Sequence, residues 1–444
     1  MKKIIISAFL LLCLTSTVTA RQRTVGEKTA IAMRLLGTNA TRSGGNAEAT
    51  LRILATADGY TVFGRTTGGF AIVSNDDANA PIVGYSENST FNASQPSLAW
   101  FLSAANDVLT SGAAKANTRT AIPTDCKKSV AKLLKTTWSQ DEPYWNTCPT
   151  DKSGNRCYTG CVATAMAQVM NFYKYPAQGM GGSATVDFEG KKYTVNYDAA
   201  SYDWDNMLDT YTQGSYDLYQ KRAISQLMYH CGVAVNMNYG VNGSGANLWD
   251  VPDAMTSHFG YITKYYGYKE YSYENYKYDF DKWNQTVYRE LSAGRPVIYA
   301  ATSYKNGNDN ASNHAFVIDG YDENGYVHVN WGYGGQGDGT FDIDVLQLKI
   351  KGSYDEEYRY YQQMVVVHHP DAGAINYDLD RIYTGINSVG TTNDDAPDTP
   401  VRVYDTTGRL IHTATVGTFN PANVNASGVV VVRQGSRAKK MVIR

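Results

Sequence analysis

The sequence predicts an α+β protein of several domains, and three observations support this fold class. The chain has 444 residues, of which 43% are hydrophobic and 18% charged, so it can bury more than one core. Apolar and polar residues alternate over Tyr60–Ser86, which favours antiparallel strands, whereas apolar residues recur at helical spacing over Val162–Tyr173. Alternation returns near the C-terminus and predicts a small all-β module.

The first 20 residues have the pattern of a secretory signal peptide. Lys2 and Lys3 precede the apolar run Ile4–Leu14, and small or hydroxyl-bearing residues follow up to Ala20. A run of this length is too short for a bilayer span, which needs about 20 residues. We therefore predict that residues 1–20 are removed after Ala20 and that the mature chain is secreted.

Residues 21–119 are predicted to form a separate α+β domain. Residues 21–45 are polar and compatible with a helix, the strands of Tyr60–Ser86 follow, and a short helix is expected to open at Trp100. Small and polar residues then fill Ser111–Asp125 without periodicity, as in the exposed linkers that proteases cut. Lys115 or Arg119 is the expected place of such a cut.

A larger domain is expected over residues 120–370. It holds most of the aromatic residues, including the Tyr-rich stretch Tyr261–Tyr288. There we expect half-buried tyrosines on strands and helices rather than a sugar-binding site. Residues 371–395 lose apolar density and are expected to be a linker. Residues 396–444 alternate again and form the predicted β module.

Charge and motif spacing exclude several functions. The chain has 40 basic and 42 acidic residues and a net charge of −2, so it lacks the basic surface that binds nucleic acid. The cysteine and histidine spacings fit no zinc site. The Gly-rich loop Gly332–Gly339 lacks the Lys-Ser/Thr pair of a phosphate-binding loop. We therefore expect no cofactor, no metal and no nucleic-acid partner.

Cysteine number and position point to one reactive thiol. Of the six cysteines, Cys13 lies in the signal peptide, and an odd number remains in an exported chain. Cys161 follows the turn Thr159–Gly160 and is the expected first residue of a helix that Pro176 ends. The dipole and the free N–H groups at this helix end favour a thiolate. The N–H of Cys161 itself could hold an oxyanion.

His314 is the expected base for this thiol. It leads an apolar strand, and the chain then turns into a second strand that carries Asn330 and Trp331. A tight turn at Asn324–Gly325 would not place Asn330 opposite His314, so a contact between them requires a wider loop or a diagonal approach. His328 is the rival base, but its position between two valines suits a satisfied strand residue better.

Gln140 is the expected second oxyanion donor. It follows the apolar run Val130–Leu134, which we expect to be helical. A side-chain amide can donate to a developing oxyanion, and one such donor is worth about 3–4 kcal/mol in acyl transfer. Since most loop glutamines are merely solvated, Gln140 is weak evidence until it is combined with the other motifs.

Taken together, these motifs resemble the streptopain family of secreted papain-fold cysteine peptidases. The segments that carry the resemblance are TGCVATAMAQVM, NHAFVIDGY, HVNWGYGG and WSQDEPYWN, and GGFAIVSNDDANAPIVGYS is similar to the inhibitory propeptide of that family. The resemblance implies a papain-like cysteine peptidase core over residues 120–370. It also implies that residues 21–119 are an α+β inhibitory propeptide.

The resemblance assigns a role to each candidate residue. Cys161 is the implied nucleophile, and His314 the implied general base and acid. Gln140 and the N–H of Cys161 form the implied oxyanion hole. Asn330 is expected to orient His314, and Trp331 to pack over that pair.

The chain departs from the family pattern in two places. Tyr333 stands where the family commonly has a second tryptophan, which affects the substrate wall. The remaining cysteines, which have no part in the mechanism, are Cys126, Cys148, Cys157 and Cys231. Among these, a disulfide between Cys148 and Cys157 is expected across the loop before the catalytic helix.

The last domain resembles the C-terminal sorting domains of type IX secretion in Bacteroidetes. This implies an interaction of residues 396–444 with outer-membrane secretion machinery, and removal of the tail on export, in some cases with attachment to surface lipopolysaccharide. The other expected partners are protein or peptide substrates and the chain's own propeptide, acting as an intramolecular inhibitor. The expected location is secreted or associated with the outer-membrane surface.

The sequence therefore predicts a secreted cysteine endopeptidase that is made as a zymogen and hydrolyses peptide bonds through a Cys-His thioester mechanism. Two alternatives stay open. The same residues could serve an amidase or transpeptidase acting on cell-wall or isopeptide bonds, because water or an amine can resolve a thioester. A catalytically dead surface adhesin or inhibitor is the other, although the presence of all the candidate residues favours an active enzyme. The family suggests a hydrophobic substrate side chain next to the cut.

Overall fold

The computed structural model describes most of the chain. The described residues are 21–37, 51–110, 120–267, 280–303, 312–343, 360–377, 400–405, 409–415, 418, 423–424, 428–434 and 437–443. The predicted signal peptide, the expected cut at Lys115 or Arg119 and most of the expected linker 371–395 lie outside them. The chain divides into two compact units, one ending at Asp378 and the other containing the C-terminal module.

The first part of the larger unit, up to residue 110, is an antiparallel sheet with two helices. The helices are α1 (Val25–Leu36) and α2 (Pro96–Thr110), and the strands are β1 (Arg52–Thr56), β2 (Tyr60–Gly64), β3 (Phe70–Ser74) and β4 (Ile82–Ser86). Leu36 of α1 packs against Phe63 and Val73 of the sheet. The strands predicted within Tyr60–Ser86 are therefore confirmed, and α2 begins a turn earlier than Trp100.

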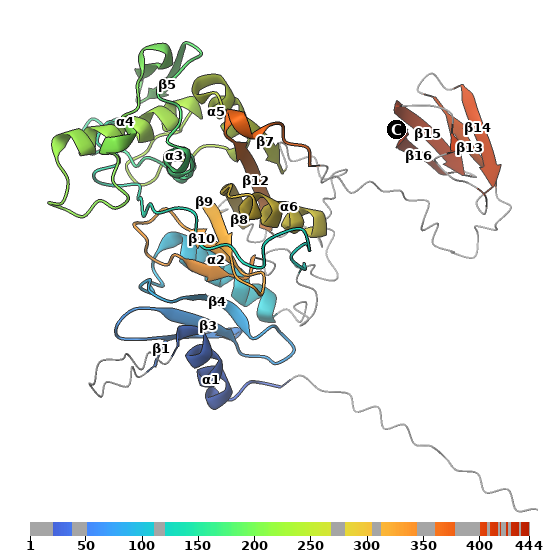
Figure 1. The fold of residues 1–444 in the computed structure, drawn as a ribbon, viewed down its shortest axis with the longest axis horizontal. Helices are drawn as coiled ribbons and strands as arrows, with labels where there is room; N and C mark the ends of the chain where they lie inside the picture. Colours follow the sequence, from blue (N-terminus) through green and yellow to red (C-terminus); the bar gives the residue numbers. More distant parts are fainter. Residues whose placement is uncertain are drawn as a thin grey trace, which may run out of the picture. The chain divides into compact units, whose positions relative to one another are not determined.

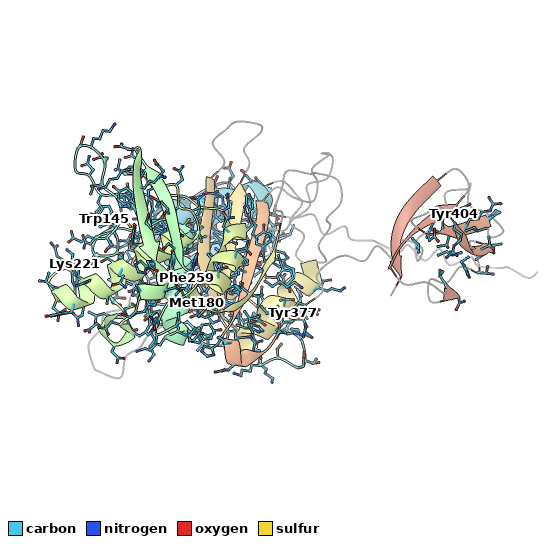
Figure 2. The ribbon with its side chains drawn as sticks, turned by 90° about the horizontal axis from the view of Figure 1, so that it is seen from above. Trp145, Met180, Lys221, Phe259, Tyr377 and Tyr404 are labelled. Atoms are coloured by element: carbon cyan, nitrogen blue, oxygen red, sulfur yellow. The ribbon has the colours of Figure 1, made fainter. Side chains whose placement is uncertain are left out.

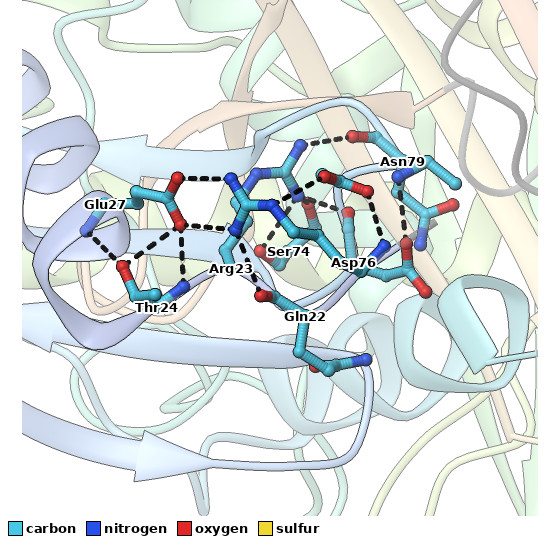
Figure 3. Close-up of polar contacts among 10 residues, drawn as sticks. Gln22, Arg23, Thr24, Glu27, Ser74, Asp76 and Asn79 are labelled. Carbon is cyan, nitrogen blue, oxygen red and sulfur yellow. Dashed lines mark hydrogen bonds and ion pairs between the residues drawn. The ribbon is translucent and has the colours of Figure 1, made fainter. Parts of the chain in front are cut away.

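The N-terminal residues of this part are tied to the loop that follows β3 (Figure 3). The Arg23 guanidinium donates to the Ser74 hydroxyl at 2.6 Å and to the Asn79 carbonyl at 2.7 Å. The backbone N–H of Arg21 donates to the Asp77 carboxylate at 2.8 Å. The chain thus packs from the first residue after the predicted signal peptide.

The segment from residue 120 to residue 377 supplies the rest of this unit. Its helices are α3 (Cys161–Tyr173), α4 (Leu218–Ala234), α5 (Val251–Phe259) and α6 (Phe280–Ser292), with 3-10 turns η1 (Tyr197–Ala199), η2 (Trp204–Asn206), η3 (Leu248–Asp250) and η5 (Pro370–Ala372). Its strands are β5 (Ser183–Phe188), β6 (Lys191–Asn196), β7 (Ile262–Tyr266), β8 (Val297–Ser303), β9 (Ser312–Tyr321), β10 (Val327–Asn330), β11 (Gly339–Phe341) and β12 (Tyr360–His368). Helices α3, α4 and α5 share one apolar core, in which Phe259 is fully buried (Figure 2).

One antiparallel sheet joins the two parts (Figure 1). Its strand order is β1-β2-β3-β4-β11-β10-β9-β8-β12-β7. At the junction, Gly84 of β4 lies opposite Phe341 of β11. A Cβ at position 84 would stand 2.4 Å from the Phe341 ring, so glycine permits this close approach. The N-terminal part therefore extends the sheet that carries the candidate site.

The two faces of the central sheet carry different helices. Ala315 and Val317 of β9 face the core of α3, α4 and α5. Side chains alternate along a strand, so Phe316 points to the opposite face. That face carries Tyr299 of β8, whose hydroxyl accepts a hydrogen bond from the Trp283 indole of α6 at 3.0 Å.

Packed structure continues to Tyr377, which is labelled in Figure 2. Its hydroxyl donates to the Glu290 carboxylate of α6 at 2.5 Å. Glu290 is fully buried and also accepts from Arg295, at 2.7 and 2.8 Å, and lies 3.0 Å from the His368 ring. Through these contacts, the chain that follows β12, up to Tyr377, packs against α6.

The second unit contains a four-stranded antiparallel sheet. Its strands are β13 (Pro400–Tyr404), β14 (Leu410–Thr415), β15 (Gly428–Gln434) and β16 (Arg437–Ile443), in the order β14-β13-β15-β16. Among its described residues, five valines form the core, namely Val401, Val403, Val424, Val430 and Val432. The alternation seen in the sequence thus corresponds to a β module.

The expectation of a helix over Val130–Leu134 was wrong. Val130 forms a β-bridge with Tyr321, and the Leu133 N–H donates to the Asp319 carbonyl at 2.8 Å. Periodicity alone does not separate a short apolar helix from a strand, and here backbone bonds to β9 favour the extended form. None of the helices in the described part of the chain is long and apolar enough to cross a bilayer.

Candidate active site

Cys161 is the first residue of α3, as the sequence predicted. The preceding Gly160 has a φ of +87°, and a Cβ there would lie 2.6 Å from the Met237 side chain. Glycine is therefore needed where the chain turns sharply into the helix. The N–H of Thr159 donates to the Gln140 carbonyl at 3.1 Å, which ties the helix start to the segment of Gln140.

The thiol of Cys161 does not have the lowered pKa that its helix position predicted. Burial raises its pKa, and the backbone N–H groups of Ala315 and Val162, which act in the opposite direction, do not compensate. Desolvation therefore outweighs the favourable helix end in this precursor. The raised pKa favours the protonated thiol over the thiolate.

His314 lies on β9, and its ring is also buried. Its Nε2 lies 2.8 Å from the carbonyl oxygen of Trp331. Since a carbonyl can only accept, Nε2 carries the proton and Nδ1 is the free basic nitrogen. Burial lowers the pKa of His314 to about 4, so the ring is neutral near pH 7. Among the described residues, no direct hydrogen bond joins this ring to the Cys161 thiol.

Among the described residues, no hydrogen bond joins the Asn330 side chain directly to His314. Asn330 lies opposite Val317, because the connection between β9 and β10 is wide and the register shifts between His328 and Val329. Its Oδ1 accepts from the N–H of Gly332 at 3.0 Å instead. That N–H belongs to the peptide unit whose carbonyl holds His314, so Asn330 reaches His314 through one peptide.

Trp331 is fixed from three directions. Its indole donates to the Gly337 carbonyl at 3.1 Å, and its backbone N–H donates to the Asp338 carboxylate at 2.8 Å. Its ring lies 6.4 Å from that of His314 and 4.8 Å from that of Phe316. Trp331 thus contributes both its carbonyl and its ring at His314. Sequence reasoning missed Asp338, whose pKa is raised by burial to about 7.

Gln140 is buried close to the same group of residues. Its side chain lies near Tyr333, and so does that of Ser97 from α2. Burial and the neighbouring Cys161 raise the pKa of Tyr333, whereas these two side chains lower it. The Tyr333 ring lies 5.4 Å from that of His314. Tyr333 therefore lies near both the candidate oxyanion donor and the candidate base.

His328 has a partner of its own, as expected for a satisfied strand residue. Its Nδ1 lies 2.5 Å from the Asp319 carboxylate. Burial opposes the charge on the ring, but Asp319 raises the pKa of His328 overall. The Asp319 carboxylate also accepts from the Leu134 N–H at 2.9 Å. His328 is therefore paired with Asp319, which agrees with its interpretation as a satisfied strand residue.

All five cysteines of the described chain are free thiols, so the expected Cys148–Cys157 disulfide is not formed. Both side chains are buried in the core of α3 and α4. The Cys148 thiol lies beside the Tyr239 phenol, and burial together with Cys157 raises its pKa to about 12. Within the part of the chain that the structure describes, no cluster of His, Cys, Asp or Glu could hold a metal ion.

Two family models match the chain over the parts just described. Residues 138–341 match the peptidase C10 family, and residues 25–108 match the Spi protease inhibitor. Streptopain of Streptococcus pyogenes is 33% identical over 315 residues, which cover 66% of this chain and 75% of streptopain. The chain belongs to the peptidase C10 family, the streptopain family.

Other members of this family agree with that result. The chain is also similar to the thiol protease/hemagglutinin PrtT of Porphyromonas gingivalis, 30% identical over 319 residues, which cover 67% of this chain and 35% of PrtT. The solved structure of prointerpain A from Prevotella intermedia is 37% identical, with a TM-score of 0.61 over 71% of this chain and 97% of that one. The predicted fold class, a papain-like core with an α+β propeptide, is confirmed. The protein is a C10 cysteine peptidase made with an inhibitory propeptide.

The propeptide holds the Gly-rich loop of the C10 domain. The Ser89 hydroxyl donates to the Gly335 carbonyl and accepts from the Gly337 N–H, both at 2.8 Å. Phe101 of α2 packs on Trp331, with ring centroids 6.0 Å apart. The propeptide thus contacts the loop that positions His314 as well as the residues around Cys161.

Replacing Ser89 with alanine is expected to speed maturation several-fold. The change removes two hydrogen bonds, each worth about 1 kcal/mol net, between the propeptide and the Gly-rich loop. The rate at which the precursor shortens would be followed by mass spectrometry. The matched control is Ser94→Ala, since Ser94 is an exposed propeptide serine. Equal rates for Ser89→Ala and the unmodified precursor would contradict this prediction.

Proposed function

We propose that this protein is a secreted endopeptidase that cuts internal peptide bonds through a thioester on Cys161. The observation that carries the proposal is the hydrogen bond from His314 Nε2 to the Trp331 carbonyl. It leaves Nδ1 as the basic nitrogen next to the start of α3, where Cys161 lies. A thiol and a basic imidazole held in this way make a nucleophile and its base.

The proposed reaction has two halves. The Cys161 sulfur gives its proton to His314 and bonds to the carbonyl carbon, and the oxyanion accepts hydrogen bonds from the Gln140 amide and the Cys161 N–H. His314 then protonates the leaving amine as the C–N bond breaks, and a thioester remains. Water, deprotonated by His314, attacks the thioester and releases the acid and the free thiol.

The propeptide is proposed to keep this site inactive until it is cut away. Phe101 of α2 packs on Trp331, and Ser89 bonds to Gly335 and Gly337, so the propeptide covers the loop beside the candidate base. Loss of contact with water raises the pKa of Cys161 and lowers that of His314 to about 4, and both shifts favour the neutral forms.

We place the maturation cut between residues 112 and 125, in the exposed linker that the sequence predicts. The proposed domain boundaries are those given above, except that the peptidase domain continues from residue 370 to Tyr377, which bonds to Glu290 of α6.

Export is the remaining part of the proposal. The N–H of Arg21 already lies at the Asp77 carboxylate, so a new α-ammonium formed by cleavage after Ala20 would face an acidic partner. We propose that residues 396–444 act as a type IX sorting domain that meets the outer-membrane secretion machinery and delivers the enzyme outside the cell or to its surface. The observation in favour is their compact β module.

Purification of residues 22–377 in reducing buffer tests the catalytic proposal. Shortening would be followed by mass spectrometry, digestion of casein by gel, and labelling by an epoxide inhibitor of papain-like enzymes by peptide mapping. We expect a loss of about 100 residues, digestion of casein and one inhibitor adduct, at Cys161. A folded chain that stays intact, inactive and unlabelled would overturn the proposal.

A further inference from the structure

Gln168 is a buried amide on the catalytic helix, and nothing in the proposed reaction uses it. It follows Cys161 by two helical turns and is only 1% exposed. Its neighbours on α3, Ala167 and Val169, are apolar and fully buried. A polar side chain in such surroundings needs hydrogen-bond partners, because an unpaired buried amide costs about 1–3 kcal/mol.

The partners of Gln168 come from two separate segments. Its Oε1 accepts from the Thr136 hydroxyl at 2.9 Å and from the Trp138 N–H at 3.3 Å. Its Nε2 donates to the Asn330 Oδ1 at 3.0 Å. The Nδ2 of Asn330 in turn donates to the Thr136 carbonyl at 2.8 Å. The two amides and Thr136 therefore form a closed, buried network.

One arm of this network leads to His314. Asn330 Oδ1 also accepts from the Gly332 N–H at 3.0 Å, and the carbonyl of the same peptide unit bonds to His314. A peptide unit is planar, so fixing its N–H also fixes its carbonyl. Gln168 saturates Asn330 Oδ1 and thereby determines which way the Asn330 amide faces.

The other arm leads to Gln140. The bond from Trp138 N–H to Gln168 fixes the backbone two residues before Gln140, and the Trp138 indole is held by the Leu208 carbonyl at 2.8 Å. The segment that presents the oxyanion donor is therefore bonded to the same helix that presents the nucleophile.

We propose that Gln168 is a positioning residue that holds the base, the oxyanion donor and the nucleophile in one fixed arrangement. The inference rests on the proposed function and adds a residue to its machinery. Gln168 touches neither substrate nor reacting atoms, and it acts through the Trp331–Gly332 peptide and through Trp138. Hydrogen-bonded networks in a low-dielectric interior are strengthened by each added bond, so loss of the central amide loosens both arms.

The test compares Gln168→Met and Gln168→Glu in the matured enzyme on a fluorogenic peptide. Displacements of about 1 Å can cost 100-fold in rate, so we expect kcat of Gln168→Met to fall about 10- to 100-fold, with KM changed less than about threefold. A less firmly held Trp331 carbonyl stabilises the imidazolium of His314 less. The pH range in which the enzyme is active should therefore narrow at both its acidic and its alkaline end. Rates are normalised to active sites titrated with the epoxide.

The pH dependence of Gln168→Glu distinguishes a positioning role from a merely structural one. An ionised carboxylate at position 168 would place a second acceptor against Asn330 Oδ1, whereas a protonated carboxyl can donate to Asn330 and accept from Thr136 as the amide does. Activity of Gln168→Glu relative to the unmodified enzyme should therefore recover as pH falls, and that of Gln168→Met should not. Should neither variant fold, Thr136→Val, which removes one bond of the network, should give a smaller fall in kcat.

The matched control is Asn171→Leu, since Asn171 is another buried amide on α3 and its Oδ1 has no partner. We expect this variant to keep the kcat and pH profile of the unmodified enzyme. Folded Gln168 variants with unchanged kcat per titrated site and an unchanged pH profile would overturn the inference alone. An unmodified enzyme without peptide hydrolysis would overturn the proposed function and the inference with it.

Discussion

The Cys161→Ala precursor should stay at full mass and lose peptide hydrolysis by at least about 10⁴-fold in kcat/KM. Removal of the nucleophile alone lowers the catalytic rate about as much as removal of the whole catalytic group, because the base then has nothing to activate. The small remaining activity would come from substrate binding and from the oxyanion donors. Intact mass during incubation and hydrolysis of a fluorogenic peptide measure the two effects.

A second cysteine variant separates catalysis from folding. Cys126→Ala is the matched control, because Cys126 is a partly exposed thiol outside the candidate site, and it should mature and cleave as the unmodified chain does. Matured enzyme added to the Cys161→Ala precursor should cut it, which shows that the precursor is a competent substrate. A Cys161→Ala chain that shortens in isolation would rule out autocatalytic maturation.

Features of the site that depend on local spacing could be predicted from the sequence. The start of α3 at Cys161 follows from a Gly turn, a run at helical period and a proline at its end. The strand that begins near His314 and the turn after it follow from apolar residues bounded by Asp, Asn and Gly. That these motifs lie close together in space could then be predicted because they all belong to one family pattern.

Features that depend on distant partners could not be predicted in this way. The run Val130–Leu134 is extended because its backbone bonds to β9, which is far along the chain. Asn330 lies opposite Val317 because the width of the connection between β9 and β10 and a register shift within β10 set which residues face each other. One signal did exist for Gln168, a single amide among apolar residues at the buried positions of a predicted helix. Its partners, however, come from segments that only the fold brings together.

The charge state of Cys161 and His314 also depends on residues that are distant in the sequence. A helix N-terminus predicts a lowered thiol pKa, yet burial in the precursor raises the pKa of Cys161 and lowers that of His314 to about 4. The propeptide covers the surroundings of both groups, since Phe101 of α2 packs on Trp331, whose ring lies near that of His314. Removal of the propeptide should therefore readmit water and let the helix end and the imidazole stabilise a thiolate.

Alkylation of Cys161 by iodoacetamide at pH 6 should accordingly be at least about 100-fold faster in the matured enzyme than in the precursor, since each unit of thiol pKa changes the thiolate fraction about tenfold. The alkylation rate of the precursor should rise with pH up to and beyond about 9, because a thiol with a raised pKa forms its thiolate only at such high pH. The matured enzyme should already be near its plateau at pH 6. Peptide mapping assigns the adduct, and Cys161→Ala in both forms corrects for the other thiols. Equal rates and pH profiles in the two forms would mean that the propeptide blocks substrate only and leaves the chemistry of the thiol untouched.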